Sequence, residues 1–167
     1  MPHWLFQILH WLQNSDLGQT MTGSSWLYTA MLMLHFTGMA MLFGAMMFID
    51  LRLLGLTKQV PLQATLSFLP IAIAGFAINL LTGFCFFAFD PFSFSRNPAF
   101  QVKMVLVLIA GLNALWFTIV EDKKLRTLAP YGDTSAAMKF SAGLSIGIWT
   151  LVIICGRMIV GFQNLHL

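Results

Sequence analysis

Residues 24–49 read SSWLYTAMLMLHFTGMAMLFGAMMFI, and this stretch contains no Asp, Glu, Lys or Arg. A helix needs about 20 mostly apolar residues to cross the hydrocarbon core of a bilayer, so a run of this length is typical of a membrane span. Backbone N–H and C=O groups cannot stay unpaired in lipid, which makes a helix the expected conformation. Residues 24–49 therefore predict a transmembrane helix.

Three further apolar runs follow along the chain, and each predicts another span. They lie near 65–89, 99–120 and 138–162. The segments between the runs carry charged residues together with proline or glycine, which favour turns. No internal repeat or interdomain linker is present. The sequence therefore predicts one all-α membrane domain over residues 1–167, a bundle of four transmembrane helices.

The composition supports this class. Of the 167 residues, 58% are hydrophobic and only 9% are charged, whereas soluble domains carry about 25% charged residues. This composition excludes a secreted disulfide scaffold, a cytosolic enzyme, a disordered tail and a nucleic-acid binder. The expected solvent of the chain is a lipid bilayer.

The basic residues divide unequally between the two ends of the predicted bundle. One side holds six of the nine: Arg52, Lys58, Lys123, Lys124, Arg126 and Lys139. The other side holds Arg96, Lys103 and Arg157. Basic residues are enriched on the cytoplasmic side of membrane proteins. We therefore expect a multi-pass membrane protein with both termini on the outer face, which is the periplasm in a Gram-negative host, and with residues 121–137 in the cytoplasm.

Residues 1–14 have the pattern of a helix lying in the membrane interface. Apolar side chains that include Trp4 and Trp11 fall on one arc of a helical wheel, and His3, Gln7, His10 and Asn14 fall on the opposite arc. Tryptophan prefers the headgroup region, and an amphipathic helix lies flat there. The segment from 14 to 23 is expected to be the turn into the first span.

His35 is the only histidine inside a predicted span, and an intramembrane polar residue is a candidate functional site. Met31 and Met39 flank it by one helical turn on the same face. An imidazole with thioethers suits a soft metal such as Cu(I), or one axial position of a haem. The alternative is that His35 hydrogen-bonds a neighbouring helix and the methionines fill gaps in the packing.

Two cations near the outer helix ends are further candidates. Arg157 lies beside small residues that leave room for an anionic group such as a haem propionate. We expect Arg157 to neutralise the charged edge of a cofactor that His35 ligates. Lys103 is expected to extend to the lipid headgroups, as long cationic side chains near helix ends do.

Small and polar residues also mark helix-packing faces. Asn79 lies in a stripe with Ala72, Gly75, Thr82 and Gly83, and Asn113 stands alone on a bulky face. Gly143 and Gly147 form a small-xxx-small pair. Such residues favour close packing and interhelical hydrogen bonds, so Asn79, Asn113 and Lys103 are assigned structural roles. No CxxC, P-loop, HExxH or dinucleotide fingerprint is present, and nothing favours an enzyme or names a catalytic residue.

Several strings resemble, in order and spacing, a bacterial inner-membrane family of unknown function. They are Leu34-His35 with Gly38, Asp50 to Gly55, Asn97 to Phe100 with Lys103, Asn113 to Leu115 with Phe117, and Cys155-Gly-Arg157. That family is similar to copper-resistance D-type proteins and four-helix b-type cytochromes. The resemblance implies a four-helix redox-type bundle with His35 and Arg157 at matched polar positions. It also implies a histidine after Phe117, where this chain has Thr118.

Three functions follow as hypotheses. The first is a haem-associated or electron-transfer membrane protein, or a subunit of a larger membrane complex, with haem b as the cofactor. The second is a copper-handling protein that uses His35 with Met31 and Met39. The third is a structural accessory subunit without a cofactor. The predicted spans hold no second histidine. The second axial position of a haem would therefore take Met31, Met39, a residue of another helix, His10 folded inward or His35 of a twofold-related partner, or it would stay empty. A homodimer is one of the forms of assembly that follow.

Overall fold

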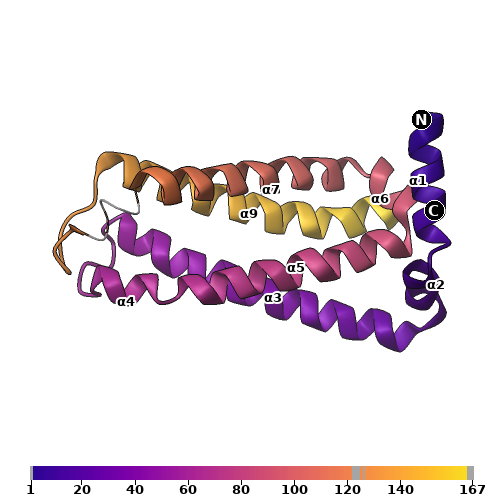
Figure 1. Cartoon of the computed structure of the whole chain (residues 1–167), viewed down its shortest axis with the longest axis horizontal. Helices are drawn as coiled ribbons and strands as arrows, with labels where there is room; N and C mark the ends of the chain where they lie inside the picture. Colours follow the sequence, from indigo (N-terminus) through magenta and orange to yellow (C-terminus); the bar gives the residue numbers. More distant parts are fainter. Residues whose placement is uncertain (1, 122–124, 126, 165–167) are drawn as a thin grey trace.

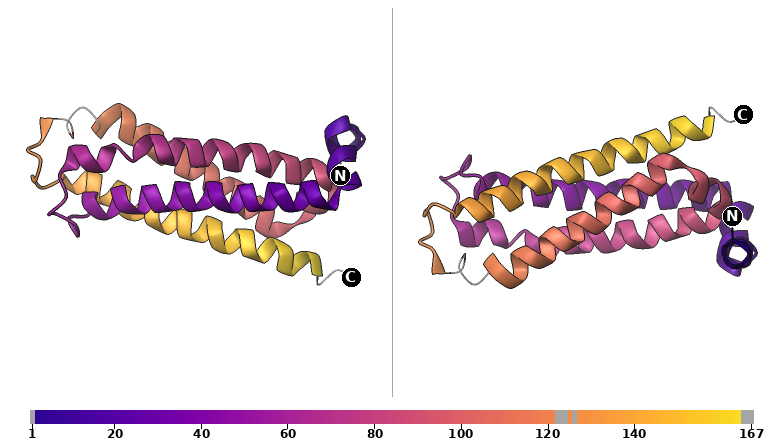
Figure 2. Two further views of the ribbon diagram at one scale, coloured as in Figure 1. Left: turned by 90° about the horizontal axis from the view of Figure 1, so that it is seen from below. Right: turned by 90° about the horizontal axis from the view of Figure 1, so that it is seen from above.

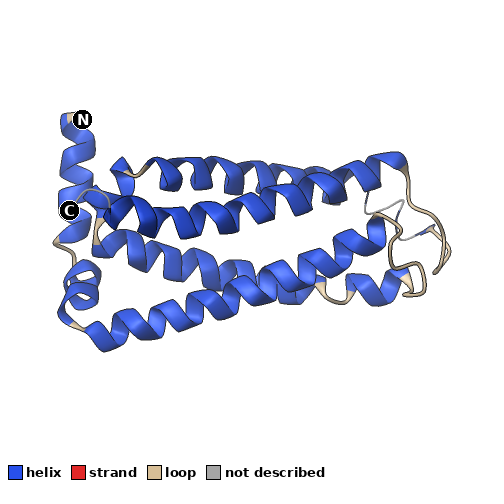
Figure 3. Cartoon of the chain, turned by 180° about the vertical axis from the view of Figure 1, so that it is seen from behind, coloured by secondary structure: helices blue, strands red, loops and turns tan. Residues whose placement is uncertain are grey.

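The computed structural model describes residues 2–121, 125 and 127–164, and this part of the chain is helical with no strand. Figure 3 shows the helices joined by short loops. Four helical segments are long and apolar enough to cross a membrane, as expected from the sequence. They are α3 (Ser25–Leu53), α5 (Leu69–Phe89) with the short α4 (Leu62–Leu66) before it, α7 (Pro98–Trp116), and α9 (Ala136–Asn164).

The long helices form two hairpins of sequence neighbours. α3 packs along α5, α7 packs along α9, and α3 also contacts α9 (Figures 1 and 2). Glycine brings the backbones of α3 and α5 together, because a Cβ atom added at Gly75 would lie 2.6 Å from the carbonyl oxygen of Gly38. Small residues permit this close approach in membrane-type bundles. By contrast, Cβ atoms added at Gly143 and Gly147 would meet no other atom within 4 Å in the described part of the chain. This pair therefore lacks the close helix contact that was expected of it.

The connection between α5 and α7 forms the short helix α6 (Pro91–Arg96), and its ends are set by side-chain caps. The Asp90 side chain accepts a hydrogen bond from the N–H of Ser93. Asn97 accepts from the N–H groups of Ala99 and Phe100 at the start of α7, and it donates to the carbonyl oxygen of Ile159 on α9. Capping by Asp and Asn satisfies the first N–H groups of a helix, and Asn97 thereby also joins the two helices.

Arg52 holds together the loops at the opposite end of the bundle. It is fully buried, and its Nε donates to the carbonyl oxygen of Val60 at 2.6 Å. A terminal nitrogen of its guanidinium lies within hydrogen-bond distance of the carbonyl oxygens of Pro130 and Gly132. The sequence had assigned Arg52 only to a set of basic loop residues. Three other members of that set, Lys123, Lys124 and Arg126, lie outside the described residues.

Helix α1 (His3–Gln13) lies across the end of the bundle where α3 begins (Figure 1). Leu9 and Leu12 are buried against the bundle, and Trp4 and Trp11 are 62% and 70% exposed. The predicted helix at residues 1–14 is therefore present, but its apolar arc is divided. Two leucines dock onto the bundle, while the tryptophans point away from it.

The segment after α1 is a helix and not the expected turn. Helix α2 spans Asp16–Gly23, and the Ser15 hydroxyl accepts a hydrogen bond from the N–H of Gly18. A serine N-cap followed by an acidic residue in the first turn stabilises a short helix. Met21, which is 2% exposed, anchors α2 in the bundle, where α2 packs on α5.

Candidate functional site

His35 lies in the middle of α3 and makes a hydrogen bond to the facing helix α5. Its Nδ1 is 2.7 Å from the hydroxyl oxygen of Thr82. That hydroxyl is also 2.7 Å from the carbonyl oxygen of Ile78, one turn earlier in α5. A threonine in a helix commonly donates its single proton to this carbonyl. We therefore assign the imidazole proton to Nδ1, which donates to Thr82.

This assignment leaves Nε2 of His35 with its lone pair. Neutral imidazole carries one donor nitrogen and one acceptor nitrogen, and the acceptor nitrogen is the one that binds a metal. Ligating histidines almost always donate their other ring N–H to a fixed acceptor, which orients the ring. Thr82, which is buried, provides such an acceptor.

The rest of α5 shapes one side of the imidazole. Phe86 meets the ring edge-on, with the two centroids 5.4 Å apart. A Cβ atom added at Gly83 would lie 3.8 Å from Cε1 of His35, which is ordinary contact. Thr82 belongs to the small and polar stripe predicted on α5, and it is this side chain that reaches His35. Asn79 instead donates to the carbonyl oxygen of Gly75 in its own helix.

Met31 and Met39 are half-buried on α3, one turn to either side of His35. Both thioether side chains are flexible and could turn toward a metal near the imidazole. Within the described ranges, no group of three or more His, Cys, Asp or Glu residues is placed to hold a metal ion. Cys85 and Cys155 are both free thiols. A metal at this site would have His35 as its imidazole ligand.

Arg157 and Lys103 differ in how far they are exposed. Arg157 is exposed on α9, so its position does not favour a charge partner in the bundle interior. Lys103 is half-buried, and its Nζ lies 3.6 Å from where a Cβ atom of Gly156 on α9 would be. Of these two cations, Lys103 is therefore the less exposed.

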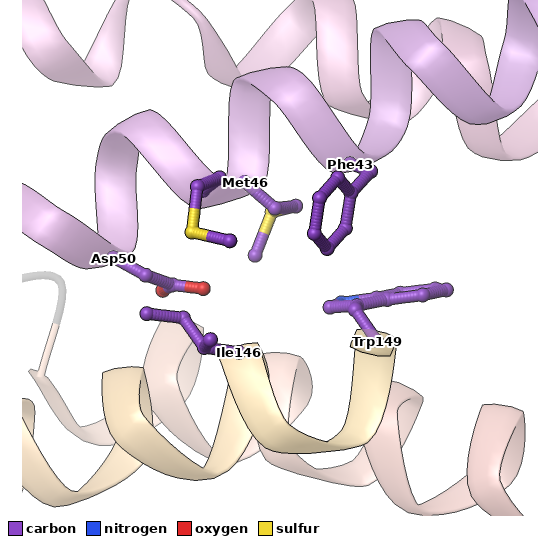
Figure 4. Close-up of a pocket in the computed structure, with 6 residues that line it drawn as sticks. Phe43, Met46, Asp50, Ile146 and Trp149 are labelled. Carbon is purple, nitrogen blue, oxygen red and sulfur yellow. The ribbon is translucent and has the colours of Figure 1, made fainter. Parts of the chain in front are cut away.

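Asp50 is a buried polar residue that the sequence analysis named only within the string from Asp50 to Gly55. It is 3% exposed, because α3 continues as far as Leu53 and carries Asp50 into the bundle. It faces α9 in a narrow crevice that also includes Ile146 and Trp149 (Figure 4). The amino-acid sequence of α3 does not tell whether a carboxylate near its end lies in the following loop or is buried by the next hairpin.

Comparison of this chain with protein-family models, with curated proteins and with solved structures finds no match.

Proposed function

We propose that the chain is a multi-pass protein of the bacterial inner membrane, with α1 lying in the outer interface. The support is the apolar outer surface of the bundle. Large hydrophobic side chains of the long helices remain exposed, including Met33, Leu81, Leu108 and Phe140. An exposed apolar surface of this extent marks contact with lipid or with another protein. The six-to-three division of basic residues supports periplasmic termini.

We further propose that it is a haem-associated or electron-transfer protein, or a subunit of a larger membrane complex. The observation that carries this proposal is the hydrogen bond between His35 and Thr82, which leaves Nε2 of a half-buried imidazole available as a ligand. His35 would bind the iron of haem b through Nε2. Lys103, in place of Arg157, would balance a propionate. The haem would supply one-electron redox chemistry to the bundle.

His35 would supply one protein ligand to a haem iron. Thr82 fixes the orientation of the ring, and Gly83 leaves the space next to Cε1 free of a side chain. A second axial ligand would come from Met31, from Met39, or from His35 of a second copy in a homodimer. A partner subunit of a membrane complex is another source.

Copper handling is the second candidate, and the placement of Met31 and Met39 on either side of His35 favours it. Thioether and imidazole ligands select Cu(I). A structural accessory subunit is the third candidate. In that case the bond from His35 to Thr82 would serve only to join α3 to α5, as polar side chains do in membrane bundles.

An absorption spectrum and a metal analysis of the same purified sample test these candidates. We expect a Soret band that is lost in His35→Ala and retained in His10→Ala, because His10 is exposed on α1. Stoichiometric copper without a Soret band would favour the second function. A wild-type protein without either, isolated under conditions that keep haem and copper available, would favour the third.

Three matched variants refine the site. Thr82→Val removes the acceptor for Nδ1 but keeps the side-chain shape, so we expect weaker haem retention and a shifted reduction potential. Lys103→Met should weaken retention, whereas Arg157→Met, an equivalent change at an exposed position, should not. Equal effects of the two cation variants would contradict the placement of Lys103 at the haem edge.

A further inference from the structure

The contact between α3 and α9 contains a buried pair of polar side chains. α3 and α9 make the main contact between the two hairpins in the described part of the chain. Asp50 on α3 and Ser145 on α9 are each 3% exposed at this contact. The hydroxyl of Ser145 is the side-chain hydrogen-bond partner of the Asp50 carboxyl. One polar pair therefore joins the hairpins where they meet.

The other side chains around the Asp50 carboxyl are apolar. They are Phe43, Met46, Met47, Ile146 and Trp149, and Figure 4 shows the carboxyl beside Met46 and Ile146. These side chains leave no room for a water molecule between the two helices. A carboxylate at this position would therefore lose its hydration while α3 and α9 stay packed.

The cations at this end of the described chain are directed elsewhere. Arg52 donates to carbonyl oxygens of the two loops. Lys58 pairs with Asp133, and the charge of Lys139 on α9 also acts on Asp133. The helices α4 and α5 contain no charged residue. Within the described ranges, a charged Asp50 would thus have a neutral hydroxyl as its partner and no cation.

A single hydroxyl does not compensate for a buried negative charge. Removing a carboxylate from water costs more than one hydrogen bond returns, unless an opposite charge is present. A neutral carboxylic acid avoids this cost, and its O–H group can still share a hydrogen bond with a serine hydroxyl. The packed arrangement of α3 and α9 therefore suits the protonated form of Asp50, whereas the ionised form requires water.

We propose that Asp50 forms a proton-controlled contact between the two hairpins. With its proton, the carboxyl stays buried beside Ser145 and α3 packs on α9. When the carboxyl O–H bond breaks and its proton passes to water, the carboxylate needs hydration, so the two helices part at this end. Asp50 lies within one turn of the end of α3, where water is near. The proposal is independent of any cofactor at His35.

The test measures the distance between the hairpins in the full chain, in lipid nanodiscs, from about pH 5 to about pH 9. Spin labels at the exposed positions Ile73→Cys on α5 and Phe140→Cys on α9 report this distance, in a background without Cys85 and Cys155. With Asp50 intact, we expect the distance to lengthen reversibly as the pH rises, in a transition that follows one proton. In Asp50→Asn, which cannot ionise, the short distance should persist at every pH.

Two controls locate the effect. Asp133→Asn makes the same change at an exposed carboxyl whose pKa lies below 3.8. That carboxyl is ionised throughout the pH range, so its replacement should leave the transition unchanged. Labels at Leu115→Cys on α7 and Phe140→Cys, both within the second hairpin, should show no transition.

The outcomes separate clearly. A distance between the hairpins that does not change with pH would overturn the proposal, and so would an equal transition in Asp50→Asn. If Asp50→Asn fails to fold, Ser145→Ala decides. Loss of the hydroxyl removes a hydrogen bond that favours the charged carboxyl, so the transition should move to higher pH by roughly one unit. An unshifted transition in Ser145→Ala would then overturn the proposal.

Discussion

Asn113 on α7 and Ser141 on α9 form two hydrogen bonds with each other across the interface of their hairpin. The Ser141 hydroxyl donates to Oδ1 of Asn113 at 3.0 Å, and Nδ2 of Asn113 donates to the carbonyl oxygen of Ser141 at 3.2 Å. Asn113 thereby joins α7 to α9. Both side-chain groups of its amide are used by a single residue of the neighbouring helix.

This pairing predicts a coupled loss of stability. Asn113→Ala should lower the free energy of unfolding by about 0.6–1.7 kcal/mol, the range found for interhelical hydrogen bonds in membranes. Ser141→Ala should lose less, because its backbone carbonyl remains. Unfolding in detergent micelles gives both values. The double variant should be less destabilised than the sum of the two single variants, and strict additivity would show that the pair does not interact.

Arg52 predicts a larger effect at the opposite end of the bundle. Arg52→Met should lower the free energy of unfolding by roughly 2–4 kcal/mol, because the loop carbonyls of Val60, Pro130 and Gly132 lose a buried charged donor. Arg96→Met provides the matched control, since Arg96 is exposed and its loss should change stability little. Reversible unfolding of both variants measures the difference. Comparable stabilities would contradict the role of Arg52 in holding the two loops.

The ion pair between Lys58 and Asp133, at 2.7 Å, predicts a pH dependence. The hydrogen bond from Lys58, together with its charge, lowers the pKa of Asp133 below its usual value of 3.8. Because the folded-state pKa is the lower one, the pair stabilises the fold above pH 3.8, and this contribution is lost as the pH falls through the folded-state pKa. An NMR titration of the Asp133 carboxyl measures its folded-state pKa. Lys58→Met should raise that pKa toward 3.8.

The exposure of Trp4 and Trp11 predicts where α1 lies relative to the bilayer. In a variant whose other tryptophans are phenylalanine, quenchers near the lipid carbonyls should reduce the fluorescence more than quenchers near the chain ends. The Leu9 and Leu12 contacts hold α1 across the end of the bundle, which keeps both rings at one depth. Preferential quenching by the deep probes would place α1 inside the bilayer.

Cysteine labelling predicts the orientation. In a background without Cys85 and Cys155, a cysteine at position 96 should react with an impermeant maleimide in cells whose outer membrane is permeable. A cysteine at position 131, where Tyr131 is 63% exposed, should react only after the inner membrane is opened. Reactivity in the reverse order would invert the proposed topology.

The sequence predicted the long helices well, because each span needs a run of apolar residues that is read locally. It missed α2, since the Ser15 cap and the burial of Met21 depend on docking against α5. The sequence also predicted His35 as a candidate ligand, but it did not identify Thr82 as the hydrogen-bond partner of His35. Thr82 is 47 residues away, and the way α5 packs along α3 determines whether Thr82 or Asn79 meets the imidazole.

The charged residues near helix ends were the hardest to predict. A cation or carboxylate at such a position can extend to the headgroups or turn inward, and the local pattern is the same for both. Lys103 turns toward α9 while Arg157 is exposed. Asp50 and Arg52 are two residues apart and both buried, yet one faces a crevice and the other serves two loops. These directions depend on which helices meet.

The close contact at Gly38 and Gly75 has a consequence for how the protein is made. α3 and α5 are consecutive long helices, joined through the short α4, and their backbones approach closely at Gly38 and Gly75. Domains generally assemble in the order of their synthesis, and inserted helices can associate once both are in the bilayer. The first hairpin can therefore close while α7 and α9 are still on the ribosome. The second hairpin then docks onto a finished surface of α3, so the nascent chain need not search all pairings of four helices at once.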